Sequence, residues 1–262
     1  SLDRLVLAWI LGAEPAGIYG AVADFVRQCA ILPAISASMS IAPIAVAALA
    51  DDRGEVVTDG LRDGVELLLA VLLPTVVGLA IAAPEVAAII LGPSYRAAAP
   101  TLIPIVAFAF MAHMISQQYI QLSFSLAKKP GYFIIHTGLI LAVNLTLMAP
   151  MVRWLGLHGA ALSLLIAEST GVLAGYLFAR KVFPLPIGLH RLIRVAGSVV
   201  IMAAATWVVR QTVAGSDSTR LMAIVGTGIL SYVAAAYWFD VVRIRGLAAD
   251  ILRRSLSVEV RR

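Results

Sequence analysis

Residues 97–127 read AAAPTLIPIVAFAFMAHMISQQYIQLSFSLA and contain no Asp, Glu, Lys or Arg. About 20 helical residues cross a bilayer core about 30 Å thick, so this run is long enough to span a membrane. Only helices and closed barrels satisfy their backbone hydrogen bonds in lipid, and the run lacks the apolar–polar alternation of barrel strands. The run therefore predicts a transmembrane helix.

Seven further apolar runs follow the same pattern, and the only charged side chain within them is Glu168. The runs are residues 5–13, 28–50, 67–84, 130–152, 154–179, 195–207 and 221–239. The sequence thus predicts an all-α, polytopic transmembrane helix bundle of about eight spans. The first run is short and starts near Ser1 with neither an initiator Met nor a signal-like segment, so we expect a piece of a longer protein with a truncated first helix.

The composition excludes a soluble single domain. The chain is 61% hydrophobic and 13% charged with a mean hydropathy of +0.94, whereas soluble domains average about half apolar and about a quarter charged. The single cysteine, Cys29, permits no intrachain disulfide. No nucleophile elbow, phosphate-cradling loop or metal-ligand spacing occurs, so we expect no enzyme activity, no catalytic residue, no cofactor and no metal.

The basic residues, which give a net charge of +5, predict orientation and not nucleic-acid binding, because they lie between apolar spans. If the even-numbered connections and the tail are cytoplasmic, they carry fourteen Lys and Arg residues. The opposite side carries four: Arg96, Arg153, Arg210 and Arg220. The positive-inside rule then places both ends of this chain in the cytoplasm.

Asp24, Arg27 and Gln28 lie within about one helical turn and share one face of the second span. Ions at membrane depth cost several kcal/mol unless they pair or face water, so they indicate a functional site. One interpretation is a water-filled cavity that binds substrate. The alternative is an interfacial pair that reaches the headgroups and anchors the helix.

The fourth span carries His113, Ser116, Gln117 and Gln121 on an arc of about 140° at about 100° per residue. These polar groups predict either hydrogen bonds between helices or a wall that lines a substrate path. His113 is a candidate proton-coupling group, because histidine titrates near physiological pH. A satisfied interior histidine is the alternative.

Two more polar groups lie inside later spans. Asn144 shares a quadrant of the fifth span with His136 and Thr137. Glu168 stands alone in the sixth span, and such a carboxylate is either neutral, paired or part of an ion relay. In the same span, a small residue at every fourth position predicts close helix packing and not a ligand motif. These positions are Ala167, Gly171, Gly175 and Ala179.

Three stretches resemble the bacterial polysaccharide or O-antigen flippase family, which belongs to the multidrug, oligosaccharidyl-lipid and polysaccharide exporter superfamily. The stretches are SLDRLVLAWILGAEPAGIYGAVADF at residues 1–25, APEVAAIILGPSYRAAAPTL at 83–102 and WLGLHGAALSLLIAE at 154–168. In the first, an Asp near a helix start is followed by Leu-Gly and by Gly-x-Tyr, here Asp3, Leu11–Gly12 and Gly17–Tyr19. The resemblance covers about residues 1–242.

This resemblance implies two pseudosymmetric six-helix lobes around a cavity, of which residues 1–180 form the C-terminal lobe. Residues 181–242 are then two additional transmembrane helices, and residues 243–262 are a basic cytoplasmic tail. The implied function is translocation of undecaprenyl-diphosphate-linked oligosaccharide across the bacterial inner membrane by alternating access. The implied partners are this substrate, membrane lipid and glycan assembly enzymes.

Of the candidate residues, the resemblance matches Arg27 with Asp24 to a charged cavity position. Together with the polar groups within the spans, the expected substrate-binding set is Asp24, Arg27, Gln28, His113, Gln117, Gln121 and Asn144. Asp3, Arg4 and Glu168 are the expected ion-coupling groups. Two rival functions stay open: a multidrug or cation antiporter of the same superfamily, and an integral membrane polysaccharide polymerase or glycosyltransferase.

Overall fold

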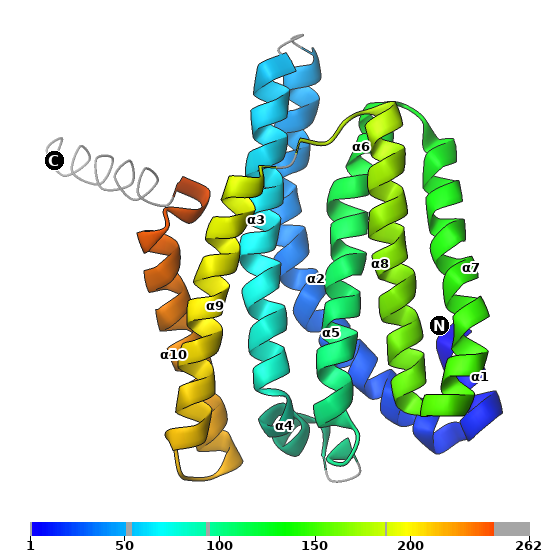
Figure 1. Cartoon of the computed structure of the whole chain (residues 1–262), viewed down its shortest axis with the longest axis vertical. Helices are drawn as coiled ribbons and strands as arrows, with labels where there is room; N and C mark the ends of the chain where they lie inside the picture. Colours follow the sequence, from blue (N-terminus) through cyan, green and yellow to red (C-terminus); the bar gives the residue numbers. More distant parts are fainter. Residues whose placement is uncertain (1, 51–53, 93–94, 187, 244–262) are drawn as a thin grey trace, which may run out of the picture.

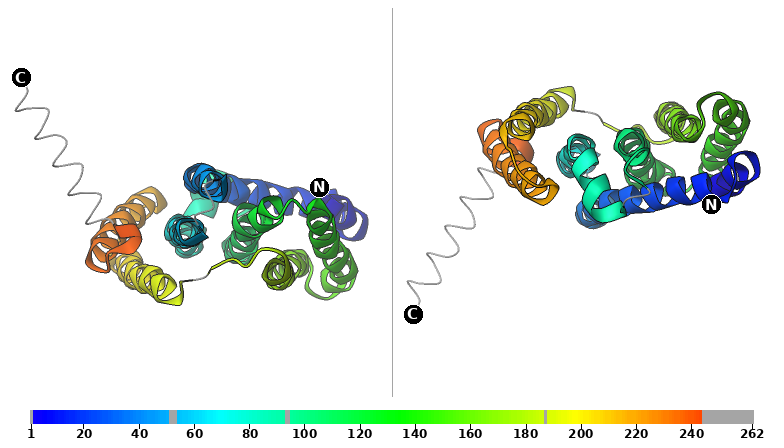
Figure 2. Two further views of the ribbon diagram at one scale, coloured as in Figure 1. Left: turned by 90° about the horizontal axis from the view of Figure 1, so that it is seen from above. Right: turned by 90° about the horizontal axis from the view of Figure 1, so that it is seen from below.

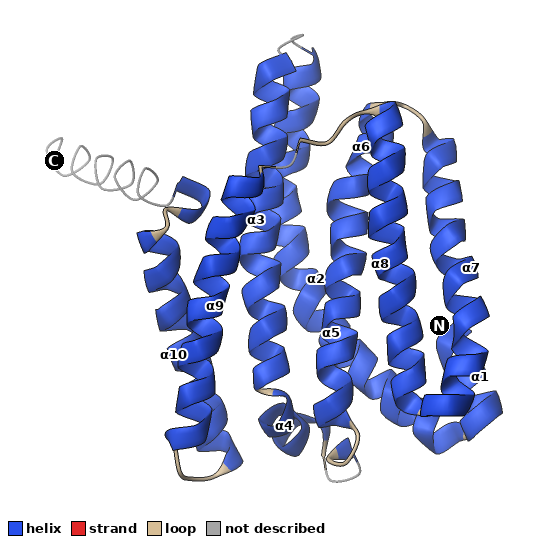
Figure 3. Cartoon of the chain, in the orientation of Figure 1, coloured by secondary structure: helices blue, strands red, loops and turns tan. Residues whose placement is uncertain are grey.

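The computed structural model describes residues 2–50, 54–92, 95–186 and 188–243, and their side chains apart from those of residues 2, 38–57 and 243. Throughout these ranges the chain is helical, with short connections and no strand (Figure 3). The long helices are α1 (Leu2–Leu11), α2 (Ala13–Ala50), α3 (Gly54–Ile81), α5 (Ala99–Ile115), α7 (Pro130–Leu155), α8 (Leu157–Val182), α9 (Leu189–Thr212) and α10 (Asp217–Trp238). The short ones are α4 (Ala83–Val86), α6 (Gln121–Leu126), the π-helical η1 (Ala87–Leu91) and η3 (Ser116–Ile120), and the 3-10 segment η4 (Val241–Arg243).

Each predicted apolar run corresponds to a helix, so the prediction of an all-α polytopic bundle is confirmed. Seven helical stretches among the described residues are long and apolar enough to cross a membrane. The fourth of the eight predicted runs is one continuous rod made of α5, η3 and α6. The first run forms the ten-residue α1, which is too short to cross alone. The chain is a multi-pass membrane protein, and residues 244–262 of its predicted basic tail lie outside the described residues.

The helices stand side by side as an elongated bundle, with α9 and α10 at one end and α1 and α7 at the other (Figure 2). The C-terminal ends of α2, α6 and α8 and the N-terminal ends of α3, α7 and α9 lie at one end of the helix axes, and the α7–α8 and α9–α10 turns lie at the opposite end (Figure 1). The helix ends that border the even-numbered connections thus share one end of the bundle and those that border the odd-numbered connections share the other, as the predicted distribution of loop charges assumes. Which end faces the cytoplasm stays a prediction.

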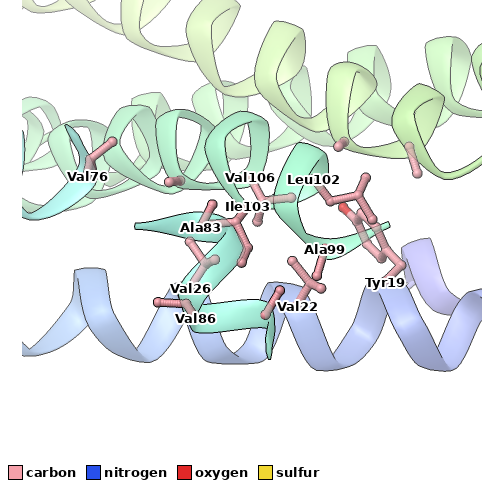
Figure 4. Close-up of a cluster of buried hydrophobic side chains, with 14 of the residues drawn as sticks. Tyr19, Val22, Val26, Val76, Ala83, Val86, Ala99, Leu102, Ile103 and Val106 are labelled. Atoms are coloured by element: carbon pink, nitrogen blue, oxygen red, sulfur yellow. The ribbon is translucent and has the colours of Figure 1, made fainter. Parts of the chain in front are cut away.

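An apolar cluster holds the centre of the bundle together. Val22 and Val26 on α2 pack against Leu102 and Ile103 on α5, and Val86 on α4 closes the cluster (Figure 4). Each of these side chains is almost completely removed from solvent. Burying a Val, Leu or Ile side chain contributes about 1.5–3 kcal/mol relative to exposing it, so this cluster fixes α2 against α5.

Large apolar side chains also cover the outside of the bundle. Ile134 and Leu141 on α7 and Leu230 on α10 are exposed, and these helices lie at its periphery. A soluble protein keeps exposed apolar patches small, whereas a hydrocarbon environment favours them. The exposed faces of α7 and α10 therefore suit contact with lipid.

Glycines shape two places in the bundle. Gly12 has φ of +96°, a conformation that L side chains rarely adopt, and it separates α1 from α2. Gly171 and Gly175 let α8 approach α7, because an added Cβ would lie 2.5 Å from Ile140 and 2.7 Å from His136, respectively. The predicted role of the small-residue pattern in close packing is confirmed for these two positions.

Candidate substrate and ion site

A cluster of three charged side chains joins α1 to α2. The Arg4 guanidinium lies 2.5 Å from the Asp24 carboxylate, and Arg27, one turn after Asp24, lies 3.5 Å from it. Arg4 also donates a hydrogen bond to the Gly20 carbonyl oxygen over 3.1 Å, in the space left by the absent Gly20 side chain. All three charged side chains are about half exposed. The cluster carries one surplus positive charge and is open to a ligand.

Asp3, the residue next to Arg4 in the chain, is not part of this cluster. Asp3 points instead to α7, where it accepts a hydrogen bond from the Asn144 amide over 2.8 Å. The Asn144 carbonyl oxygen accepts a hydrogen bond from Ser163 on α8 over 3.2 Å. Asn144 is thus buried within a network of three helices, and its amide is already in use.

Glu168 does not stand alone, because α5 supplies a partner. Nδ1 of His113 lies 3.0 Å from Oε1 of Glu168, although the two residues are 55 positions apart in the sequence. The Glu168 side chain is 8% exposed and that of His113 is 32% exposed. Of the alternatives left open by the sequence, the paired carboxylate is the one observed.

The polar stripe predicted on the fourth span is altered by η3. Residues 116–120 form a π-helical turn, so the spacing of 100° per residue does not hold between His113 and Gln121. Gln121 is buried and Gln117 is partly buried, while Gln28 on α2 is exposed. The hydroxyl oxygen of Ser116 is buried without a hydrogen-bond partner.

An apolar groove of about 500 Å³ runs between the α2–α3 side of the bundle and the α9–α10 pair. Residues that line it include Cys29, Pro74, Met202, Ile224, Gly228 and Tyr232. Its walls are almost entirely apolar, which suits a hydrocarbon chain and not a sugar. None of these residues was predicted as a site from the sequence.

Two buried carboxylates fasten the α9–α10 pair to the bundle. Glu66 on α3 accepts a hydrogen bond from the Val242 backbone N–H over 2.8 Å and lies 3.5 Å from Arg191 on α9. Glu85 on α4 pairs with Arg210 on α9 over 3.2 Å. From the sequence, these arginines were counted only as loop charges. Each is predicted on the same side of the membrane as the glutamate it contacts, and this could have suggested the pairing.

Across residues 2–50, 54–92, 95–186 and 188–243, no group of three or more His, Cys, Asp or Glu side chains is placed to hold a metal ion.

The class of protein that this fold and these sites define is a multi-pass helical membrane protein with charged and apolar sites between its helices. No protein-family model matches the chain, and no curated protein is significantly similar to it. A solved structure described as "Lipid II flippase MurJ, inward closed conformation" is similar to it, with a TM-score of 0.69 and 17% sequence identity. The likeness covers 90% of this chain and 52% of that chain, so this chain spans about half of that structure's length. The fold therefore resembles about half of that structure.

Proposed function

We propose that this chain is part of a flippase that moves undecaprenyl-diphosphate-linked oligosaccharide across the bacterial inner membrane for polysaccharide biosynthesis. It acts by alternating access, through rocking of two lobes around a site near the midplane. The observation that carries the proposal is the half-exposed Arg4–Asp24–Arg27 cluster on apolar helices of this fold. Charged groups at such positions are costly and mark substrate or ion paths.

The chemistry of such a substrate fits the sites that the chain supplies. A diphosphate needs cations, and Arg27 presents its guanidinium beside Asp24. Sugar hydroxyls need amide and imidazole partners, for which we propose Gln28, His113, Gln117 and Gln121. Asn144 belongs to the proposed set through the Asp3–Ser163 network that it holds together. The groove beside α10 suits the polyprenyl tail. Asp3 and Arg4, which each pair with another helix, are proposed as ion-coupling groups.

The proposed organisation follows from the same function. Residues 1–180 form the C-terminal lobe, residues 181–242 are an additional helix pair, and residues 243–262 are a basic tail. Both ends of the chain lie in the cytoplasm. The remaining half of the protein then supplies the opposite lobe and further cations for the diphosphate, and glycan assembly enzymes supply and consume the substrate.

Replacement of Arg27 in the full-length protein tests the proposal. In Arg27→Ala, Asp24 keeps its closer partner Arg4, so the helices stay folded while the cavity loses one positive charge. We expect loss of surface polysaccharide and accumulation of lipid-linked oligosaccharide on the cytoplasmic leaflet, at unchanged protein abundance in the membrane. Arg153→Ala, which removes an exposed arginine from α7, is the matched control and should leave export intact.

Other outcomes identify the rival functions. Normal surface polysaccharide in Arg27→Ala would remove Arg27 from the substrate site. Cation-dependent dye efflux without any polysaccharide defect on deletion would favour a multidrug or cation antiporter. Elongation of lipid-linked sugars by the purified protein without translocation would favour a polymerase or glycosyltransferase.

A further inference from the structure

Three glutamates are buried among the described residues, and they differ in the kind of partner that each one faces. Glu66 and Glu85 face Arg191 and Arg210, and a guanidinium stays charged at any physiological pH. Glu168 faces His113, and an imidazole can lose its proton near neutral pH. Of the three buried glutamates, Glu168 is thus the one whose partner can change from positively charged to neutral.

We propose that His113 and Glu168 form a binding site for one proton, which is taken up and released during transport. With that proton present, the pair is neutral overall, whether the proton resides on Nδ1 of His113 or on the carboxyl group. Removal of the proton leaves neutral imidazole beside a buried carboxylate, which is a net charge of −1. This inference rests on the proposed function and adds the source of energy to it.

The surroundings of Glu168 make the proton-free form costly. Its second carboxylate oxygen, Oε2, is buried without a hydrogen-bond partner, so the site offers little solvation to the anion. Uncompensated charge in a membrane interior costs several kcal/mol. A conformation that keeps the pair closed therefore favours the bound proton, and one that opens it to water permits release. Such a difference in affinity lets proton binding shift the balance of conformations.

His113 is the more accessible member of the pair. Its side chain is four times as exposed as that of Glu168, 32% against 8%, which makes the ring the route by which the proposed site exchanges its proton. The ring of Phe110 packs edge-on against it, with 6.1 Å between the ring centroids. Ser116, one turn later, lies in η3 and has a buried hydroxyl without a partner. π-Helical turns of this kind are frequent at functional sites.

Most of the titratable groups on the neighbouring elements have partners of their own. Asp3 on α1 is near enough for a charge on it to act on Glu168, and Tyr19 on α2 is buried with its hydroxyl unpaired. His136 on α7 is bound to the Gly171 carbonyl oxygen, one turn from Glu168. The other packed elements carry groups with their own partners: Arg4, Asp24 and Arg27 at the α1–α2 cluster, Glu66 on α3, Glu85 on α4 and Tyr119 on η3.

The first test measures proton binding without transport. Infrared difference spectra of the purified full-length protein between pH 5 and pH 9 detect proton loss from a carboxyl group or an imidazole. We expect a component of the wild-type spectrum to be absent in both Glu168→Gln and His113→Gln. Glu85→Gln, which alters a buried carboxylate that faces arginine, should retain that component. Coincident spectra of wild type and Glu168→Gln, with both proteins folded by gel filtration, would overturn the proposal.

The second test measures coupling in proteoliposomes that contain the full-length protein and a lipid-linked oligosaccharide. Coupling of one proton to one lipid lets a gradient of one pH unit change the steady-state leaflet ratio by up to about tenfold. We expect this bias in wild type and Glu85→Gln, and none in Glu168→Gln. Flipping without the bias would overturn proton coupling, whereas the infrared signal without any flipping would reject the proposed substrate and leave the proton site standing.

Discussion

Asn144 on α7 donates a hydrogen bond to Oδ1 of Asp3 on α1 over 2.8 Å, although 141 positions separate the two residues in the chain. The same amide group accepts a hydrogen bond from Ser163 on α8. A single buried side chain thus ties three helices together, and it gives the short α1 a polar anchor on α7.

Replacement of Asn144 should therefore destabilise the bundle. Asn144→Leu leaves the Asp3 carboxylate and the Ser163 hydroxyl without this partner, and loss of a buried partner costs about 1–3 kcal/mol. We expect a lower Tm of the purified full-length protein in a thermal-shift measurement. Thr146→Ala is the control. Thr146 is exposed on the same helix, and its hydroxyl donates a hydrogen bond to the Ala142 carbonyl oxygen one turn earlier. Equal Tm values for the two variants would contradict this role of Asn144.

The α7–α8 contact predicts opposite effects for two glycine replacements. In Gly175→Ala the added Cβ would lie 2.7 Å from Nε2 of His136 and from Ile120, so the helices must separate and the Tm should fall. In Gly138→Ala on α7 the Cβ meets nothing within 4 Å, and alanine favours a helix by about 1 kcal/mol over glycine. The Tm of Gly138→Ala should be unchanged or higher. A loss of stability in Gly138→Ala as large as in Gly175→Ala would count against the packing described.

The Glu85–Arg210 pair predicts a measurable coupling energy. Arg210→Met leaves the buried Glu85 carboxylate without its cation, which should cost about 3–5 kcal/mol. In Glu85→Gln/Arg210→Met no buried charge remains at this site, so part of the lost stability should return. A double-mutant cycle based on unfolding in denaturant measures the coupling. Additive effects of the two replacements would mean that the ion pair contributes nothing to the attachment of α9.

Cys29 offers a chemical probe of the groove beside α10. It lies in the wall of the groove and is the only cysteine of this chain. If the groove holds the lipid tail, alkylation with N-phenylmaleimide should fill it and slow flipping of lipid-linked oligosaccharide in proteoliposomes. Cys29→Ala should transport normally and resist the reagent. Inhibition of Cys29→Ala to the same extent would place the sensitive thiol elsewhere.

Charge-free runs were enough to predict the helices, because a membrane span needs many consecutive apolar residues. The bounds of α7 and α8 lie within three residues of the ends of the predicted runs 130–152 and 154–179. The contact between Asp24 and Arg27 was also predictable, since residues three apart on a helix are neighbours. These features depend on local sequence alone.

The pairing of His113 with Glu168 could not be predicted in the same way. It depends on how α5 and α8 are rotated and brought together, which no local pattern specifies. The π-helical turn at residues 116–120 could not be predicted either. A sequence of this composition can form an α-helical or a π-helical turn, and the local pattern does not distinguish the two. Likewise, Arg4 pairs with Asp24 only because the bend at Gly12 folds α1 back along α2.

The two attachments of the α9–α10 pair have a mechanical consequence. Glu66 and Glu85 hold this hairpin to α3 and α4 near opposite ends of α9, so a torque applied to α3 is transmitted along the full length of α9. A hairpin pinned at two distant points cannot swing away from α3 without breaking a buried ion pair. These contacts favour movement of the hairpin together with α3 and α4, and a hydrocarbon chain in the groove between them would move with it.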